Sequence, residues 1–242
     1  MAESGRESTP GAAEELEFIN LISHELRGPT ALLRGHLSMW LDGNPVALPS
    51  ELLPSVRACY GSVLRLNNLI NQMILALRIR RKTLVANYRP LDLTQWLRAL
   101  AHDISLIVTS TRHGFQLELP PSSIHAEGDP FLLGVALFNL VDNAQKFSSA
   151  STIVRVALSD RDGGVAIDVI DQGQGFPQGF TPEAFARVDR DLGFERPGVG
   201  VGLYIAQGVA AAHGGRLEFS SAPGGSSVRL WLPSRKEELN EG

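Results

Sequence analysis

Apolar residues recur with the three-four spacing of an α-helix in two stretches of the chain. The first stretch is apolar at six of its eight positions, which are Leu16, Ile19, Ser23, Leu26, Thr30, Leu33, Leu37 and Trp40. The second is apolar at all eight, which are Leu52, Val56, Cys59, Val63, Leu66, Ile70, Met73 and Leu77. Asp42, Gly43, Asn44 and Pro45 supply a turn between them. Because a lone hairpin of two such helices would expose its apolar stripes, the pattern favours a homodimeric four-helix bundle.

Beyond residue 82 the apolar pattern mixes helical and strand periods. Helices are predicted at 92–110, 129–147 and 203–213, and strands at 115–119, 152–158, 165–170, 216–220 and 227–232. On the second of these helices one face is expected to pack on the sheet, with Leu133, Leu137, Leu140, Ala144 and Phe147. The mixture predicts that an α+β sandwich follows the all-α helical hairpin, so the chain is multidomain.

Composition and charge narrow the class of protein. The formal net charge of −4 gives no support for nucleic-acid binding, and the single cysteine, Cys59, excludes an internal disulfide. Cys59 is expected to be a small core residue, because it occupies a stripe position. No apolar run approaches the roughly 18 residues that span a bilayer, so we expect no membrane contact within this chain and a cytoplasmic location. Residues 1–13 are interpreted as a polar linker or leader, and residues 236–242 as a polar tail.

The first candidate for chemistry is the segment Phe18-Ile-Asn-Leu-Ile-Ser-His-Glu-Leu-Arg-Gly-Pro29. His24 follows a stripe position, so its side chain is predicted to point away from the helix seam. Glu25 could accept a proton from one ring nitrogen while the other attacks phosphorus, although a histidine beside a glutamate is also a common surface pair. Pro29 lies inside the helical pattern, next to Gly28, and predicts a bend just after His24.

The second candidate lies on the helix predicted at 129–147. Asn139, Asn143 and Lys146 are spaced i, i+4 and i+7, which gathers two carboxamides and an ammonium group on one face. A carboxamide oxygen such as that of Asn143 can bind Mg²⁺, and Lys146 can neutralise phosphate charge. A solvated polar face would show the same spacing.

Two glycine-containing segments complete the set. Asp171, Gly173 and Gly175 follow a predicted strand, where a buried carboxylate could select the exocyclic amine of adenine and the glycines would let the backbone approach a ligand. Gly198, Gly200, Gly202 and Leu203 open a predicted helix, whose N-terminus could bind phosphates. Taken singly, the first is typical of a turn and the second of a flexible loop.

The four segments, in this order and spacing, resemble the H, N, G1 and G2 boxes of bacterial sensor histidine kinases. The resemblance covers residues 14–233, and Arg187 lies in a segment similar to the F box, with Pro182 where that box usually has phenylalanine. It implies a dimerisation and phosphoacceptor domain at residues 14–82, and at residues 83–235 an ATP-binding domain of the type shared with DNA gyrase.

The resemblance also implies a role for each matched residue. His24 would be the phosphoacceptor, Glu25 its base, Asn143 the Mg²⁺ ligand and Asp171 the adenine reader. Contacts to ATP are implied for Asn139, Lys146 and Arg187, and lid or phosphate contacts for Gly173, Gly175, Gly198, Gly200, Gly202 and Leu203. The implied partners are a second copy of the chain and the receiver domain of a response regulator, whose aspartate accepts the phosphoryl group.

One departure from the family pattern bears on function. Gly28 stands where many such kinases carry Thr or Asn to orient a water molecule, so we expect weak phosphatase activity toward the phosphorylated partner. Two alternatives stay open: a serine kinase of the same ATPase superfamily, and a dimeric scaffold that binds nucleotide without turnover.

Overall fold

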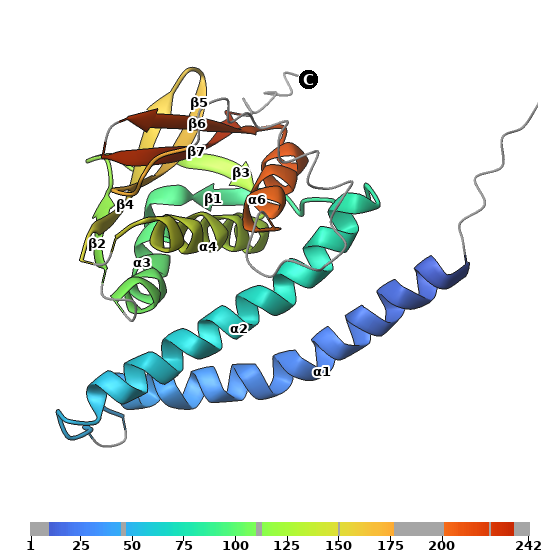
Figure 1. Ribbon diagram of the computed structural model, residues 1–242. Coiled ribbons are helices and arrows are strands. Elements are labelled where there is room, and N and C mark those ends of the chain that lie inside the picture. The colour runs from blue at the N-terminus through green and yellow to red at the C-terminus, as the bar shows by residue number, and fades with distance from the viewer. Residues whose placement is uncertain are drawn as a thin grey trace, which may run out of the picture.

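The computed structural model describes residues 10–44, 47–109, 113–149, 151–176, 201–222 and 224–234; for residues 10–20 and 222 it describes the backbone alone. Two long helices, α1 (Pro10–Leu41) and α2 (Leu53–Arg80), form an antiparallel hairpin that extends below a mixed α/β domain (Figure 1). Pro29 lies inside α1, which continues past it and is bent along its length (Figure 1). No helix among the described residues is both long and apolar enough to cross a membrane.

The hairpin buries only part of each apolar stripe. On α1, Ser23, Thr30 and Leu37 are buried, with exposed fractions of 9% or less, and they recur every seven residues. The residues three positions further on in each repeat are exposed, namely Leu26, Leu33 and Trp40. The expectation that Cys59 is a core residue is wrong for the single chain, because its side chain lies on an exposed face of α2.

The α/β domain is built on a five-stranded sheet with the order β2-β4-β5-β7-β6. Its strands are β2 (Gly114–Glu118), β4 (Ile153–Arg161), β5 (Gly164–Asp171), β6 (Arg216–Ala222) and β7 (Gly225–Pro233). Only β2 pairs with its neighbour in parallel; the other three pairings are antiparallel. Three helices cover one face of this sheet, α3 (Leu93–Thr109), α4 (Pro130–Phe147) and α6 (Val201–Ala212), which gives the predicted α+β sandwich (Figure 1).

A second, two-stranded sheet was not predicted from the sequence. It pairs β1 (Arg89–Asp92) with β3 (His125–Gly128) in antiparallel register. Both strands are only four residues long, and β1 contains Pro90, so neither carries a clear alternating pattern. The carboxylate of Asp92 accepts a hydrogen bond from the backbone N–H of Gln95, which lowers the pKa of this side chain and caps α3.

The core of the α/β domain lies between the sheet and the three helices. The predicted sheet-facing residues of α4 are buried there, with Leu133 and Leu137 fully inaccessible. Phe147 is the exception: its side chain is 51% exposed, so that part of the prediction is wrong. It is the last residue of α4, and Ser148 immediately leaves the helix to bridge with Gly173. The ring therefore lies beyond the layer that the sheet covers.

The α/β domain packs along α2. At one end, the buried Tyr60 donates a 2.8 Å hydrogen bond to the carboxylate of Asp103 on α3. At the other end, Ile79 lies against Gly208 of α6, where an added Cβ would come within 2.4 Å of the isoleucine Cδ1. The hairpin and the α/β domain are thus in contact over most of the length of α2.

Candidate functional site

Asp171 is fixed at the end of β5 by hydrogen bonds to both carboxylate oxygens. Its side chain is 6% exposed. Oδ1 accepts a 2.7 Å bond from the backbone N–H of Gly173, and Oδ2 accepts a bond from the hydroxyl of Ser226 on β7. Because each oxygen has a second lone pair, the carboxylate can still accept a hydrogen bond from a ligand, as the prediction for this residue requires.

Glycines surround this carboxylate because the backbone around it is crowded. A Cβ on Gly173 would lie 2.4 Å from the carbonyl oxygen of Phe147, and one on Gly225 would lie 2.3 Å from that of Asp171. Gly175 has a φ of +77°, and a Cβ there would meet the hydroxyl of Ser221 at 2.2 Å. Side chains larger than hydrogen are therefore excluded at these positions.

The polar face predicted on α4 is graded from buried to exposed. Asn139 is 1% exposed, Asn143 is half-buried, and Lys146 is exposed and forms a 2.5 Å ion pair with Asp142. Gly202, in the first turn of α6, lies against the first two: an added Cβ would be 3.1 Å from Oδ1 of Asn139 and 3.4 Å from Nδ2 of Asn143. The fold thus brings the second and fourth predicted segments together.

The start of α4 is held by two side chains, those of Asp129 and His213. Asp129 caps the helix by accepting hydrogen bonds from the backbone N–H groups of Phe131 and Leu132. Its own backbone N–H donates to Nε2 of His213, a buried histidine whose Nδ1 lies 2.8 Å from the carbonyl oxygen of Val209. Both contacts are satisfied only by a neutral imidazole with its hydrogen on Nδ1.

The histidine of the first segment is exposed, as predicted. The side chain of His24 is 83% exposed and that of Glu25 is 74% exposed, whereas the preceding Ser23 is buried. The His24 Nδ1 lies 3.8 Å from a carboxylate oxygen of Glu25. The pair lies on α1, while α2 is the helix of the hairpin that packs on α3, α4 and α6.

Three of the predicted site residues, Arg187, Gly198 and Gly200, lie outside the described residues. Leu203 is described and is buried in the core of the α/β domain, so its contribution there is packing.

Sequence reasoning missed two residues of α2 that contact the site. The carboxamide oxygen of Asn139 accepts hydrogen bonds from the side-chain amides of Gln72 and, at 3.5 Å, Asn68. Both polar residues lie beside the apolar stripe of α2, and only the docking of that helix on α4 turns them toward the site.

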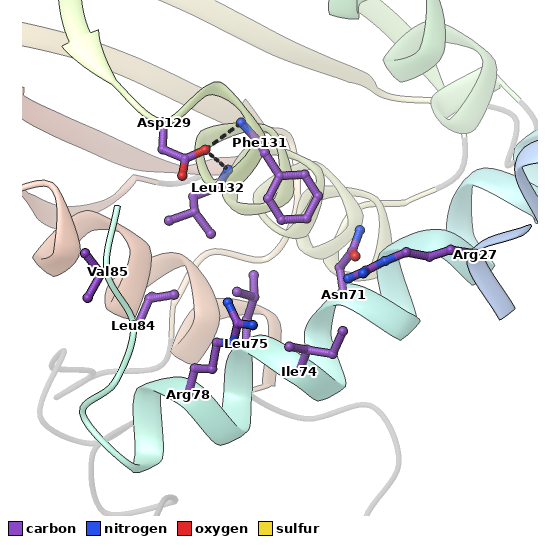
Figure 2. Close-up of a pocket in the computed structure, with 10 residues that line it drawn as sticks. All are labelled: Arg27, Asn71, Ile74, Leu75, Arg78, Leu84, Val85, Asp129, Phe131 and Leu132. Atoms are coloured by element: carbon purple, nitrogen blue, oxygen red, sulfur yellow. Dashed lines mark hydrogen bonds between the residues drawn. The ribbon is translucent and has the colours of Figure 1, made fainter. Parts of the chain in front are cut away.

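A small cavity lies between the hairpin and the start of α4 (Figure 2). Neither Asp171 nor Gly202 is among the residues that line it. Its volume is about 110 Å³. Arg27 reaches it from α1 and Arg78 from α2, opposite Asp129 and Phe131 (Figure 2). Among the described residues, no group of three or more His, Cys, Asp or Glu side chains could hold a metal ion, either here or elsewhere.

The segment that contains this site is similar to a known protein family. Residues 128–236 match the family described as "Histidine kinase-, DNA gyrase B-, and HSP90-like ATPase". This segment includes α4, Asp171 and the start of α6, so the site lies in an ATPase domain of that class.

Other proteins are similar to most of the chain, including the hairpin. The phosphate regulon sensor protein PhoR of Pseudomonas aeruginosa is 28% identical over 88% of the chain and 48% of its own length. The sensor histidine kinase YkoH of Bacillus subtilis is 27% identical over 90% of the chain and 47% of its own length. The solved structure of full-length ShkA in complex with AMPPNP is 27% identical, covering 91% of this chain and 47% of that one, with a TM-score of 0.55.

The sequence and fold of the chain are therefore similar to those of the catalytic core of bacterial sensor histidine kinases, the family that the four ordered segments resemble. The chain spans about half the length of the curated relatives it matches.

Proposed function

We propose that this chain transfers the γ-phosphoryl group of ATP to His24 and then to an aspartate on the receiver domain of a response regulator. The observation that carries this proposal is an exposed histidine paired with a glutamate, in the same chain as an ATPase domain of the histidine kinase class. We assign phosphoacceptance and dimerisation to residues 14–82 and ATP binding to residues 83–235. We expect the reaction to take place in the cytoplasm, where ATP is available.

In the first step, one ring nitrogen of His24 attacks the γ-phosphorus. The Nδ1 of His24 faces Glu25 at 3.8 Å, which leaves Nε2 as the nucleophile. As the N–P bond forms, the bond from phosphorus to the leaving oxygen of ADP breaks, and Glu25 takes the proton from Nδ1. The distance is longer than a hydrogen bond, so the pair has to tighten in the reacting complex.

In the ATPase domain, Asp171 would accept a hydrogen bond from the exocyclic amine of adenine. Its carboxylate is already oriented by Gly173 and Ser226, so little ordering is needed when the base binds. Gly175 would let the backbone approach the base. This arrangement supports a site that discriminates adenine by a buried acceptor.

On the phosphate side, Asn143 would hold Mg²⁺, which would supply positive charge to neutralise the phosphates. The residues fit this role: the carboxamide of Asn143 is half-buried beside Gly202, and Mg²⁺ commonly takes one protein ligand together with phosphates and water. Lys146 would leave Asp142 to contact phosphate. We assign further nucleotide contacts to Asn139, Arg187, Gly198, Gly200 and Gly202, and to the backbone of Leu203, whose side chain lies in the core.

We further propose that two chains pair through the hairpin. The exposed Leu26, Leu33 and Trp40 of α1, together with Leu66 and Met73 of α2, support this assembly. Burying such side chains contributes about 1.5–3 kcal/mol each, which favours a four-helix bundle over a monomer.

Gly28 should limit hydrolysis of the phosphoryl group on the partner. It has no side-chain group to hold a water molecule, and no heavy atom lies within 4 Å of the Cβ it lacks, so a larger residue would fit. We expect Gly28→Thr to accelerate dephosphorylation of a phosphorylated receiver domain in the presence of ADP, compared with the unchanged chain. A fast reaction in the unchanged chain would contradict this prediction.

The test of the main proposal is labelling with γ-³²P-ATP and Mg²⁺. We expect label on the chain and none on His24→Ala, while His36→Ala, at an exposed histidine further along α1, keeps it. The bound phosphoryl group should be lost in acid and survive in base, as expected for a nitrogen-phosphorus bond. Acid-stable label would instead indicate a serine kinase, and nucleotide binding without any label a scaffold.

A further inference from the structure

Three carboxamide side chains meet where α2 crosses α4, and we name Asn68, Gln72 and Asn139 the carboxamide cluster. The oxygen of Asn139 accepts from the amide groups of Gln72 and Asn68, while its own Nδ2 donates to the carbonyl oxygen of Val135 at 2.8 Å. A carboxamide oxygen has two lone pairs. In this conformation both are therefore used by α2.

The same oxygen lies beside the segment that is proposed to bind phosphate. The Cβ that Gly202 lacks would be 3.1 Å from Oδ1 of Asn139, so this atom lies at the junction of α2, α4 and the first turn of α6. With an exposed fraction of 1%, Asn139 has no room for a further partner unless α2 moves away. Contact with α2 and contact with a nucleotide phosphate thus require the same side chain.

The contact of α2 with the α/β domain combines buried apolar side chains, Leu75 among them, with one unsatisfied polar group. Tyr60 is buried against α3, and Ile79 packs tightly on Gly208 of α6. Between them, Oδ1 of Asn68 is buried without a hydrogen-bond partner in the described structure. An unsatisfied buried acceptor is destabilising, so the cluster fixes the register of α2 without making its docking tight.

We propose that the carboxamide cluster is an autoinhibitory contact: α2 holds Asn139 in a resting state, and nucleotide competes with Gln72 and Asn68 for it. This inference rests on the proposed ATP site. Because a ligand that binds only the undocked state must first shift the population, docking lowers the apparent affinity for nucleotide. By reciprocity, bound nucleotide weakens the contact between α2 and α4.

The test compares nucleotide affinity in variants of the full chain. Gln72→Met keeps the side-chain length but removes the donor, and we expect it to tighten binding of Mg²⁺ with an ATP analogue about fivefold, the effect of losing one hydrogen bond from the docked state. Gln72→Leu also removes the donor, carries no charge that could repel the phosphates of the nucleotide, and should tighten binding to a similar extent. Asn67→Ala is the matched control, since Asn67 neighbours Asn68 on α2 but is outside the cluster, and its affinity should be unchanged.

Hydrogen exchange supplies a readout that does not depend on catalysis. Protection of α2 residues 60–79 should fall in Gln72→Met without nucleotide, and fall in the unchanged chain when nucleotide is added. If the unchanged chain binds nucleotide and both Gln72 variants bind it equally or more weakly, the autoinhibitory contact is overturned while the proposed function stands. If no variant binds nucleotide, the proposed function fails and this inference fails with it. Binding by the Gln72 variants alone would support both.

Discussion

The helical hairpin and the α/β domain bury their apolar residues in different ways. In the α/β domain, the apolar side chains of five strands and three helices form one continuous core, in which residues such as Leu137 and Ile167 are fully inaccessible. In the hairpin, every second stripe position of α1 from Ser23 onward stays exposed, as Leu33 does with 51% of its surface. A sheet and its covering helices can enclose a core within one chain, whereas two helices cannot. The α/β domain therefore buries its apolar side chains within one chain. The exposed apolar side chains of the hairpin can be buried only against another protein surface.

The largest expected effect comes from opening a cavity in the core of the α/β domain. Leu137→Ala should lower the free energy of unfolding of the α/β domain by about 2–5 kcal/mol, because the methyl groups that it removes are fully buried. Urea unfolding followed by circular dichroism measures this change. A loss below 1 kcal/mol would show that the core is less closely packed than its burial indicates.

The same substitution in the hairpin should act on assembly instead. Leu33→Ala should change the stability of the single chain by less than about 0.5 kcal/mol, because its side chain is half exposed there. It should weaken the proposed dimer about tenfold or more, since each of the two chains would lose a leucine buried at the interface. Sedimentation over a range of concentrations measures the dissociation constant, and an unchanged value would place the interface elsewhere. Leu137→Ala is the matched control, because it removes the same side-chain atoms from the α/β domain and should leave the dissociation constant unchanged.

The smallest expected effect concerns the hydrogen bond that joins the two regions. Burial, with the hydrogen bond to Asp103, raises the pKa of Tyr60 to about 12. Because the pKa is about 10 in the unfolded chain, the neutral phenol stabilises the fold fully below pH 10, and this contribution is lost as the pH rises toward 12. Tyr60→Phe should cost about 1 kcal/mol at pH 7.

The difference in the free energy of unfolding between Tyr60→Phe and the unchanged chain should shrink above pH 10. In that range only the unchanged chain loses the contribution of the Tyr60 phenol. Unfolding by urea at pH 7, 9 and 11 tests the prediction. Parallel pH dependence in the two proteins would mean that the hydroxyl is not held by the contact between α2 and α3.

Much of the architecture could be predicted because local patterns determine it. The two helical stripes, the helix of Asn143 and the strand before Asp171 were all found from periodicity, with limits that differ by a few residues from those observed. The two-stranded sheet escaped prediction because four-residue strands contain too few alternations to be recognised. Phe147 was assigned to the core because its helical phase is right, but phase does not tell where the sheet ends.

The candidate site was predictable residue by residue but not as an arrangement. Asp171 and the glycines could be singled out, since a carboxylate and flexible backbone after a strand are local features. The partners that orient Asp171, above all Ser226, could not be found, because 55 residues separate the two in the chain. The same holds for Gln72 and Asn139, which are 67 residues apart.

The amino-acid sequence by itself determined the type and order of the elements, the exposure of His24 and the family resemblance, because hydrophobic period and short motifs act over one or two helical turns. Only the tertiary structure decided which polar groups meet. It joined Asp171 to Ser226, brought Gly202 against Asn139 and Asn143, and placed α2 across them. Such pairings are set by how helices and strands pack on one another, and packing is a property of surfaces that many distant residues form together.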